Sequence, residues 1–388
     1  MAPELKGVNL KKGTNINRFV ITEKISEGSY GSVYVCKEKG TGKEAALKAE
    51  MLSNSGNCLK LEVQILKRLK GKRHVAQFIS CGKCGNFCYM IMTLLGKSLS
   101  YYIYNCKLQF TMPTILRIIL QSLYALKQIH ESGFIHRDMK PANMTVGRGG
   151  IDKRIIHIID FGLAREFVIL DNGRLRLRKP RDRCLFRGTI KYCSINALEN
   201  AEQGRGDDLV SLFYICSEFS NQLPWSSATT KTQVLQIKKE VPDKELYPSD
   251  CETLGEILSY VKGIRYNQRP DYFYIYAKLK EELDQWGCMY SDPYDWELYE
   301  CDNRSIVKKP RKKHKKLIQR GDESNSIQSV TNSGTTSTTS SLINSSAKTS
   351  SGKSVDGVTI NDKILEYSNE FFEEHLSSKY FKNNELGF

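Results

Sequence analysis

The sequence lacks a long hydrophobic run. Its 388 residues contain no stretch of about 18 consecutive apolar residues, and no charged segment at the amino terminus leads into an apolar one. A membrane-spanning helix requires the first feature, and a secretory signal peptide requires the second. We therefore expect a soluble, intracellular protein without a membrane span, which resides in the cytoplasm, the nucleus or both.

The sequence also lacks the paired ligands of a zinc site, although it contains 12 cysteines. Cys81, Cys84 and Cys88 lie close together, but no second pair of ligands follows them at the spacing of a zinc finger. Residues 75–92 show instead the pattern of two β-strands. Because thiols stay reduced inside most cells, we expect free cysteines and no structural zinc. We find no internal repeat.

The sequence does contain a short span of residues suited to phosphoryl transfer. A His-Arg-Asp motif ends at Asp138, and an Asp-Phe-Gly motif begins 22 residues later at Asp160. Transfer of a phosphoryl group from ATP to a hydroxyl requires placement and charge neutralisation more than covalent chemistry. Asp138 would accept the hydroxyl proton, and Lys140 would lie beside the transferring phosphate. Asn143 and Asp160 would supply the oxygen ligands that Mg²⁺ prefers.

A glycine-containing segment precedes this span at residues 25–33. It lies between two apolar stretches, which predicts a β-hairpin whose backbone passes close over phosphates. Gly28 and Gly31 fit the pattern GxGxxGxV, but Ser26 stands where its first glycine belongs. By itself, this segment favours a plain hairpin over a nucleotide-binding loop.

A lysine and a glutamate complete the predicted set of charged groups. Lys48 lies in a predicted strand at residues 44–50, where it would hold the α and β phosphates. Glu62 lies in a predicted helix at residues 59–69, partly turned toward its apolar stripe. In isolation both would be unconnected surface charges. Their order and spacing relative to residues 136–162 favour an ion pair.

These motifs together resemble those of the protein kinases, and within them the casein kinase 1 group, with the tau-tubulin kinase branch most similar. The sequence Ser194-Ile195-Asn196 stands where most eukaryotic kinases carry Ala-Pro-Glu. Further similar segments occur at residues 204–209, 211–214, 222–225 and 291–297. The resemblance covers roughly residues 13–298.

The resemblance implies an α+β fold with the two lobes of a eukaryotic protein kinase. The β-rich amino-terminal lobe with one main helix would span about 13–92, after an extension at 1–12. A hinge at about 93–96 would lead into a mainly helical carboxyl-terminal lobe at about 97–298. Length agrees, because some 285 residues suit such a domain and about 90 remain for other segments.

The resemblance also implies that ATP and Mg²⁺ bind between the lobes, with Met92 as the gatekeeper and Leu94 and Leu95 in the hinge. Asp208 would brace the catalytic loop, and Arg269 would have a structural role. The implied ATP-binding residues are Ile25, Gly28, Gly31, Val33, Ala46, Lys48, Glu62, Met92, Leu94 and Leu95. The implied catalytic residues are Asp138, Lys140 and Asn143, and the implied metal ligands are Asn143 and Asp160.

The acceptor is expected to be serine or threonine in a protein. The lysine in His-Arg-Asp-x-Lys is the serine/threonine form of this motif, and Thr189 belongs to a Gly-Thr-x-x-Tyr stretch beside the substrate hydroxyl. Basic residues crowd residues 174–191, which favours acidic or phosphorylated substrates, although a solvated basic loop stays an alternative. The candidate substrate-binding residues are Arg178, Arg181, Arg183, Arg187, Thr189 and Lys191.

The carboxyl-terminal tail divides into three segments. A basic linker at 299–320 holds seven Lys or Arg among the nine residues 308–316, and it acts as a tether or an import signal. No aromatic residues interleave this run, so nucleic-acid recognition ranks last. A Ser/Thr-rich segment at 321–358 should be disordered. A short amphipathic helix at 359–388 would dock on the catalytic domain or on a partner.

Two other classes of function stay open at this point. A pseudokinase scaffold, which binds ATP and partners without phosphoryl transfer, would explain Ser26. A nucleic-acid-binding protein would explain the net charge of +15. Neither accounts for the complete set of catalytic residue types, so we expect an active enzyme that is a monomer and acts in signalling.

Overall fold

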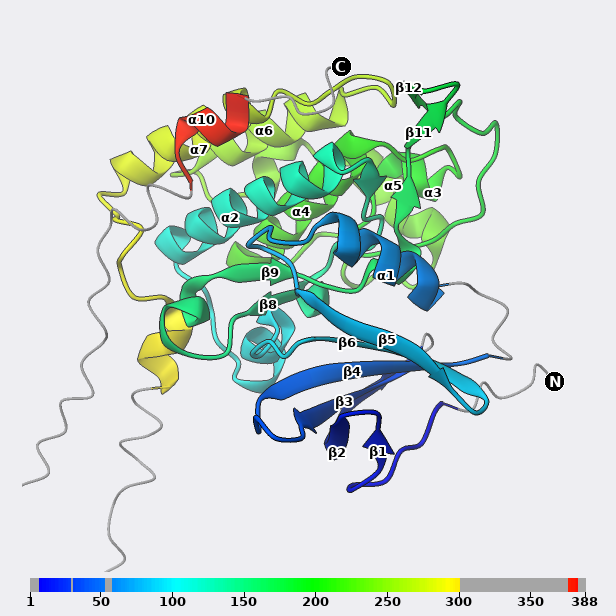
Figure 1. The fold of residues 1–388 in the computed structure, drawn as a ribbon. Coiled ribbons are helices and arrows are strands. Elements are labelled where there is room, and N and C mark those ends of the chain that lie inside the picture. Colours follow the sequence, from blue (N-terminus) through cyan, green and yellow to red (C-terminus); the bar gives the residue numbers. More distant parts are fainter. Residues whose placement is uncertain (1–6, 29–30, 53–57, 301–375, 383–388) are drawn as a thin grey trace, which may run out of the picture. The chain divides into compact units, whose positions relative to one another are not determined.

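A six-stranded antiparallel sheet forms the amino-terminal lobe in the computed structural model, which describes residues 7–28, 31–52, 58–300 and 376–382 (Figure 1). The strands follow one another across the sheet in the order β1-β2-β3-β4-β6-β5. They are β1 (Asn15–Ile16), β2 (Phe19–Gly28), β3 (Gly31–Glu38), β4 (Glu44–Met51), β5 (Phe78–Cys84) and β6 (Phe87–Thr93). The predicted hairpin is therefore present, with Gly28 paired to Gly31.

Strand β4 is buried on both faces, and its side chains alternate between two environments. Ala45, Leu47 and Ala49 enter a small hydrophobic core beneath the sheet. Ala46 and Lys48 point the other way, as the two-residue period of a strand requires. The only helix of eight or more residues in the described part of this lobe, α1 (Cys58–Arg68), packs beside β5 and β6. The sheet thus presents Lys48 toward the rest of the molecule.

Helices dominate the carboxyl-terminal lobe. The long ones are α2 (Met112–Glu131), α4 (Arg205–Ser220), α5 (Lys231–Glu240), α6 (Glu252–Lys262) and α7 (Tyr272–Gln285). Helices α2 and α4 are buried along most of their length and form the centre of the large core. Fold class is as predicted, since a β-rich lobe precedes a helical one.

Short strands and turns connect these helices and carry the polar motifs. Two small hairpins belong to this group, β8 with β9 and β11 with β12. The elements are η1 (Tyr101–Asn105), β7 (Phe134–Ile135), η2 (Pro141–Asn143), β8 (Met144–Val146), η3 (Gly150–Arg154), β9 (Ile156–Ile158), η4 (Phe161–Leu163), β10 (Arg165–Glu166), β11 (Val168–Asp171), β12 (Arg174–Leu177), α3 (Ile195–Leu198) and η5 (Asp243–Leu246).

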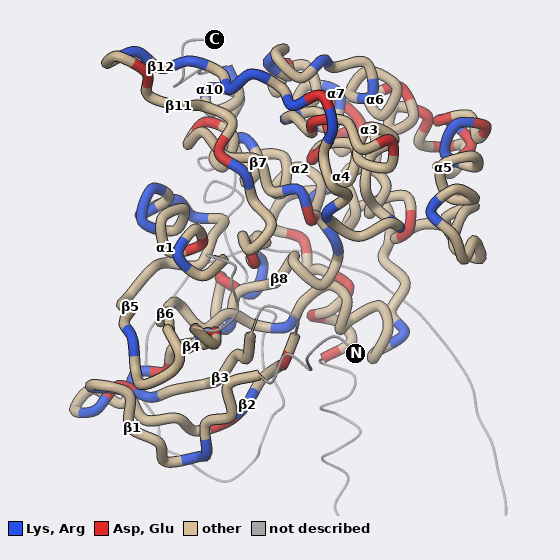
Figure 2. The backbone as a smooth tube through the Cα atoms, turned by 90° about the vertical axis from the view of Figure 1, so that its right-hand side faces the viewer, with Lys and Arg blue, Asp and Glu red and all other residues tan. Residues whose placement is uncertain are grey.

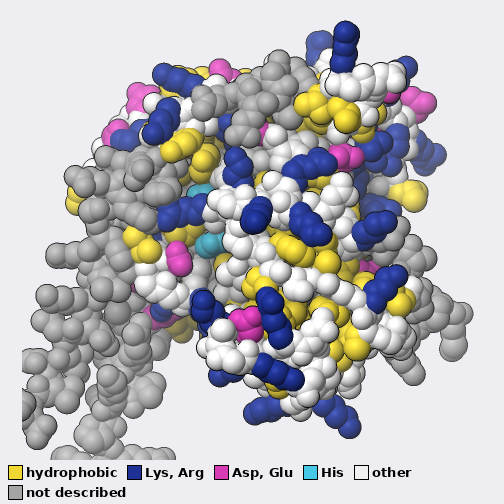
Figure 3. Space-filling view, viewed as in Figure 1, with side chains coloured by type: hydrophobic (Ala, Val, Ile, Leu, Met, Phe, Trp, Pro, Cys, Tyr) yellow, Lys and Arg dark blue, Asp and Glu magenta, His cyan; other side chains and the backbone are white. Residues whose placement is uncertain are grey.

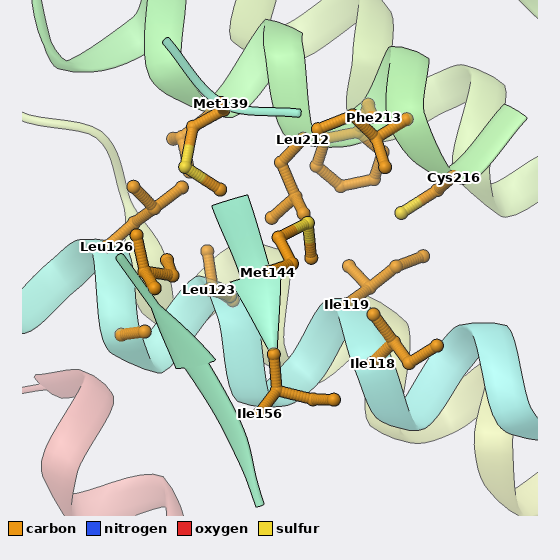
Figure 4. Packing of buried hydrophobic residues seen from close by; sticks show 14 of the residues in the cluster. Ile118, Ile119, Leu123, Leu126, Met139, Met144, Ile156, Leu212, Phe213 and Cys216 are labelled. Atoms are coloured by element: carbon orange, nitrogen blue, oxygen red, sulfur yellow. The ribbon is translucent and has the colours of Figure 1, made fainter. Parts of the chain in front are cut away.

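The β8–β9 hairpin is fixed from below by apolar packing. Met144 and Ile156 project from its strands toward α2 and α4, where Leu123 and Leu212 meet them (Figure 4). All four side chains are fully buried. This packing anchors the chain directly after Asn143 and so determines where the preceding polar motif lies.

A segment far along the chain returns to this lobe. Helix α10 (Ser378–Lys382) packs against α7 and α2 (Figure 1), and Phe381 is completely buried there. The expectation that the carboxyl-terminal helix docks on the catalytic domain agrees with this contact, although only residues 376–382 of the predicted 359–388 are described. The Ser/Thr-rich segment and all but the first two residues of the basic linker lie outside the described residues.

Charge is distributed unevenly over the described surface. Basic side chains outnumber acidic ones on the face shown in Figure 3, and arginines mark strand β12 in Figure 2.

Within the part of the chain that the structure describes, no helix is both long and apolar enough to span a membrane.

Candidate active site

A cavity of about 600 Å³ lies where the sheet meets the helical lobe. All ten residues predicted to bind ATP line it: Ile25, Gly28, Gly31, Val33, Ala46, Lys48, Glu62, Met92, Leu94 and Leu95. The β2–β3 hairpin and β4 supply one wall, and the end of β6 supplies another. Ser26 also lines the cavity, so the departure from the glycine pattern lies within the site.

Sequence reasoning missed several lining residues. Ala76, Thr145 and Ile159 contribute to the same cavity. Their side chains carry no charge and belong to no motif. Closeness in sequence to a predicted site residue could have indicated two of them, since Ile159 directly precedes Asp160 and Thr145 lies two residues after Asn143.

Lys48 lies between two carboxylates at the inner end of the cavity. Its Nζ is 2.6 Å from Glu62 Oε2 and 2.8 Å from Asp160 Oδ1. Burial favours the neutral amine, but the two carboxylates outweigh it and raise the pKa of Lys48. Burial likewise opposes ionisation of Asp160, yet Lys48 holds the pKa of that carboxyl below its usual range. A fixed cation therefore faces the cavity.

Asp138 is the centre of a second cluster. Lys140 Nζ donates to Asp138 Oδ2 at 2.6 Å, and the Thr189 hydroxyl donates to Oδ1 at 2.7 Å. The Asn143 amide donates to the backbone carbonyl of Asp138 at 2.9 Å. The Asp138 side chain is only 6% exposed, and the hydrogen bonds from Lys140 and Thr189 determine the orientation of its carboxylate. Sequence-predicted residues from positions 138 to 189 thus converge on one carboxylate.

The backbone before Asp138 is held by Asp208 of α4. The Asp208 carboxylate accepts hydrogen bonds from the backbone N–H groups of His136 at 2.7 Å and Arg137 at 2.8 Å. Burial opposes its ionisation, but the His130 ring and the His136 N–H group lower the pKa of Asp208. Arg137 has φ of 66°, a left-handed conformation that this anchoring stabilises. The implied brace is therefore present.

Arg269 also lies where a structural role requires it. Its guanidinium forms an ion pair with Glu131, the last residue of α2, with an N–O distance of 3.1 Å. Arg269 itself lies more than 100 residues after the catalytic motifs in the sequence. The contact links the segment before α7 to α2.

Residues 19–265 match the family described as protein kinase domain. The chain belongs to the protein kinase family. A relative from Caenorhabditis elegans, named "Putative serine/threonine-protein kinase K06H7.1", is 37% identical over 286 residues, which are 72% of this chain and 82% of the relative. A relative from Dictyostelium discoideum, named "Probable serine/threonine-protein kinase DDB_G0292354", is 33% identical over 284 residues, which are 72% of this chain and 57% of the relative.

Protein kinases use ATP and typically Mg²⁺, and two residues of this kinase fit the metal. The Asn143 side-chain nitrogen is committed to Asp138, so its carbonyl oxygen is the atom left for a ligand. Asp160 lines the same cavity with its pKa lowered, so its carboxylate is ionised. Amide and carboxylate oxygens are suitable donors for this hard cation. Bound magnesium would neutralise charge on the phosphates.

The predicted substrate-binding arginines of the kinase do not all line the same cavity. Arg181, Arg183 and Arg187 line a cavity of about 300 Å³ together with Arg137 and Arg165. Glu202 pairs with two members of this cluster, Arg165 at 3.2 Å and Arg181 at 2.7 Å. Burial and the neighbouring arginines lower the pKa of Arg137 to about 10. Among the described residues, Glu202 thus pairs with two of the five arginines that line this cavity.

The other two predicted basic residues have carboxylate partners elsewhere. Arg178 contacts Glu166 at 3.3 Å, and Lys191 pairs with Glu218 on α4. Thr189 lies at Asp138 and is separate from both. Arg178 and Lys191 thus form ion pairs outside the lining of the cavity, whereas Arg181, Arg183 and Arg187 line it.

Proposed function

We propose that this kinase transfers the γ-phosphate of ATP to serine or threonine hydroxyls of proteins. The observation that carries this proposal is the arrangement around Asp138 beside the cavity that contains Lys48: Lys140 and Thr189 donate to its carboxylate, and Asn143 donates to its backbone carbonyl. The names of the two relatives and the lysine at position 140 support serine and threonine as acceptors.

Each charged residue then has one task. The acceptor oxygen forms a bond to the γ-phosphorus while the bond from that phosphorus to the β–γ bridging oxygen breaks, and ADP leaves. Asp138 orients the hydroxyl and takes its proton. Lys140 offsets charge that develops on the transferring group, and Lys48 holds the phosphates behind it.

We also propose that the preferred substrates carry acidic or already phosphorylated residues. The cavity supports this, because five guanidinium groups line it and, among the described residues, Glu202 pairs with two of them, so the cluster attracts anions. The five are Arg137, Arg165, Arg181, Arg183 and Arg187. The Ser-Ile-Asn sequence at 194–196 supports placement in the casein kinase 1 group, near the tau-tubulin kinases.

The first experiment measures phosphate transfer from labelled ATP with magnesium to casein, and compares the wild type with Asp138→Asn. Transfer that Asp138→Asn abolishes supports the proposal. If the wild type binds ATP without transferring phosphate, the alternative of a pseudokinase scaffold replaces it, with Ser26 as the first residue to examine.

A second experiment tests substrate preference with neutral, acidic and phosphorylated versions of one serine peptide. The acidic and phosphorylated peptides should have the lower KM, and Arg183→Gln should remove most of this difference. Arg174→Gln is the matched control, because Arg174 is an exposed arginine on strand β12 outside the cavity. Equal KM values for all three peptides would refute the preference.

A further inference from the structure

Residues 189–194, here called the acceptor segment, lie next to the catalytic aspartate. Thr189 opens the segment and donates to Asp138. Ile190 follows with an apolar side chain that is 37% exposed. Because Asp138 takes the proton of the acceptor hydroxyl, a peptide residue beside the acceptor meets this part of the chain. The conformation of the acceptor segment therefore affects peptide binding.

A buried lysine holds the acceptor segment from below. Lys238 lies on α5 and is only 1% exposed. Its Nζ donates to the backbone carbonyl of Ile190 at 3.1 Å and to that of Cys193 at 2.6 Å. Both acceptors are main-chain oxygens, so the contact constrains the backbone of the segment and not a side chain.

Two aromatic rings complete the environment of this amine. Lys238 Nζ lies 4.7 Å from the ring centre of Tyr214 and 4.9 Å from that of Trp225, and the two rings meet edge to face. Trp225 Nε1 donates to the carbonyl of Lys191 at 2.8 Å. The carbonyls of residues 190, 191 and 193 are thus all held by donors from α5 and the loop after α4.

The electrostatic environment of Lys238 is unusual for a buried lysine. Among the described residues no carboxylate forms an ion pair with it, although a buried cation is ordinarily paired. Ring faces and carbonyl oxygens stabilise the ammonium instead. Burial lowers the pKa of Lys238 to about 8, with a further contribution from Lys262.

We propose that Lys238 is a positioning residue that fixes the acceptor segment for peptide binding and so determines the KM of the peptide substrate. The inference rests on the proposed kinase activity, and it adds a residue that touches neither ATP nor the acceptor. A lysine that served stability alone would not require contacts with two carbonyls of this one segment.

The same geometry makes peptide binding sensitive to pH. The groups that face Lys238 are Cys193 from the acceptor segment, Tyr214 from α4 and Lys262 from α6, which pairs with Asp243 of η5. As pH rises through about 8, the amine loses its charge, and its hydrogen bonds to the carbonyls weaken. The KM of the peptide should increase over this range, while the KM of ATP should not.

The test compares Lys238→Met with Lys239→Met. Both variants lose one positive charge from the same turn of α5, but Lys239 is an exposed residue that pairs with Glu199. Lys238→Met should raise the KM of a serine peptide about five- to tenfold without a change in the KM of ATP, because charge-assisted hydrogen bonds are lost. It should also remove the increase in peptide KM above pH 8. Peptide KM and pH dependence equal to those of Lys239→Met would overturn the proposal.

A second variant covers the case in which Lys238→Met does not fold. Trp225→Phe keeps a ring over Lys238 and removes the hydrogen bond to Lys191. A higher peptide KM with normal thermal stability supports the premise that the backbone of the acceptor segment determines peptide KM, and an unchanged KM refutes that premise and the positioning role with it. Phosphate transfer by the wild type distinguishes the two proposals. A wild type without phosphate transfer would refute the proposed function itself. An active wild type, with variants whose peptide KM is unchanged, would refute only the role of Lys238.

Discussion

The hydroxyl of Thr189 donates a hydrogen bond to the carboxylate of Asp138, 2.7 Å away and 51 residues earlier in the chain. A glycine makes this approach possible. Gly188 has φ of +110°, and a Cβ atom there would lie 2.6 Å from the carbonyl oxygen of Arg137. The segments around Asp138 and around Thr189 are therefore in direct contact, and a substitution in one should change the geometry of the other.

Replacement of Thr189 by valine should lower kcat/KM for a peptide by about ten- to hundredfold. Valine matches the shape of threonine but cannot donate to Asp138, so the carboxylate loses one of the groups that orient it. Steady-state kinetics with a serine peptide measures the effect. Thr189→Ser retains the hydroxyl and is the control, and activity of Thr189→Val equal to that of the wild type would show that the contact is dispensable.

Two glycines of the β2–β3 hairpin should respond differently to alanine. Gly31 has φ of +124°, and a Cβ atom there would lie 2.2 Å from the carbonyl oxygen of Ala49. A Cβ atom at Gly28 would meet no atom of the described residues within 4 Å apart from its chain neighbours, and the φ angle of Gly28 is not positive. Gly31→Ala should therefore lower the free energy of unfolding by about 1–3 kcal/mol, whereas Gly28→Ala should change it by less than about 1 kcal/mol.

Urea unfolding of both variants measures this difference, and ATP affinity gives a second readout. Similar unfolding curves for the two would mean that the strand pair relaxes around the new methyl group. Ser26→Gly tests the third position of this hairpin. A lower KM for ATP would show that Ser26 weakens ATP binding by the hairpin, and an unchanged KM would show that the hairpin binds ATP equally well with serine.

The catalytic motifs could be predicted from sequence because their chemistry fixes both residue type and spacing. The Lys48–Glu62 pair is an example, since 14 residues separate the two and the structure places their charged atoms 2.6 Å apart. No motif identifies Ala76, Thr145 and Ile159 as lining residues. Their side chains are common, and only the packing of β8, β9 and the sheet brings them to the cavity.

Charged residues outside motifs were harder to interpret. Arg178 and Lys191 belong to the same basic stretch as Arg183, but the fold pairs them with Glu166 and Glu218. Sequence does not indicate which carboxylate will lie opposite a given arginine. Lys238 is the extreme case, because a lysine on an amphipathic helix ordinarily faces water and this one is buried by tertiary contacts.

Replacement of Asp208 by asparagine should reduce both stability and activity. The carboxylate accepts from two backbone N–H groups and contacts the His130 ring, so an amide leaves at least one buried donor without an acceptor. We expect a loss of about 2–4 kcal/mol in the free energy of unfolding, together with a lower kcat. Asp250→Asn is an exposed control on the same lobe. Unchanged stability with normal kcat would show that the brace is not required.

Removal of the Phe381 ring should destabilise the kinase although it lies more than 200 residues after Asp160 in the chain. The ring is fully buried and stacks on Tyr276 with centroids 4.3 Å apart, and Tyr124 lies 5.6 Å away. Phe381→Ala should therefore lower the free energy of unfolding by about 3–5 kcal/mol. Lys379→Ala, an exposed position on the same helix, should have an effect within about 0.5 kcal/mol.

Urea unfolding decides this prediction, and a chain that ends at Glu300 provides an independent comparison. Loss of α10 exposes Tyr124 and Tyr276 on α2 and α7, so the shortened chain should be destabilised to at least the same extent as Phe381→Ala. Equal stability of all these proteins would show that the docked helix contributes nothing in solution. A higher kcat for the shortened chain, with the kcat of Phe381→Ala raised as well, would mean that the docked segment restrains catalysis and does more than stabilise the fold.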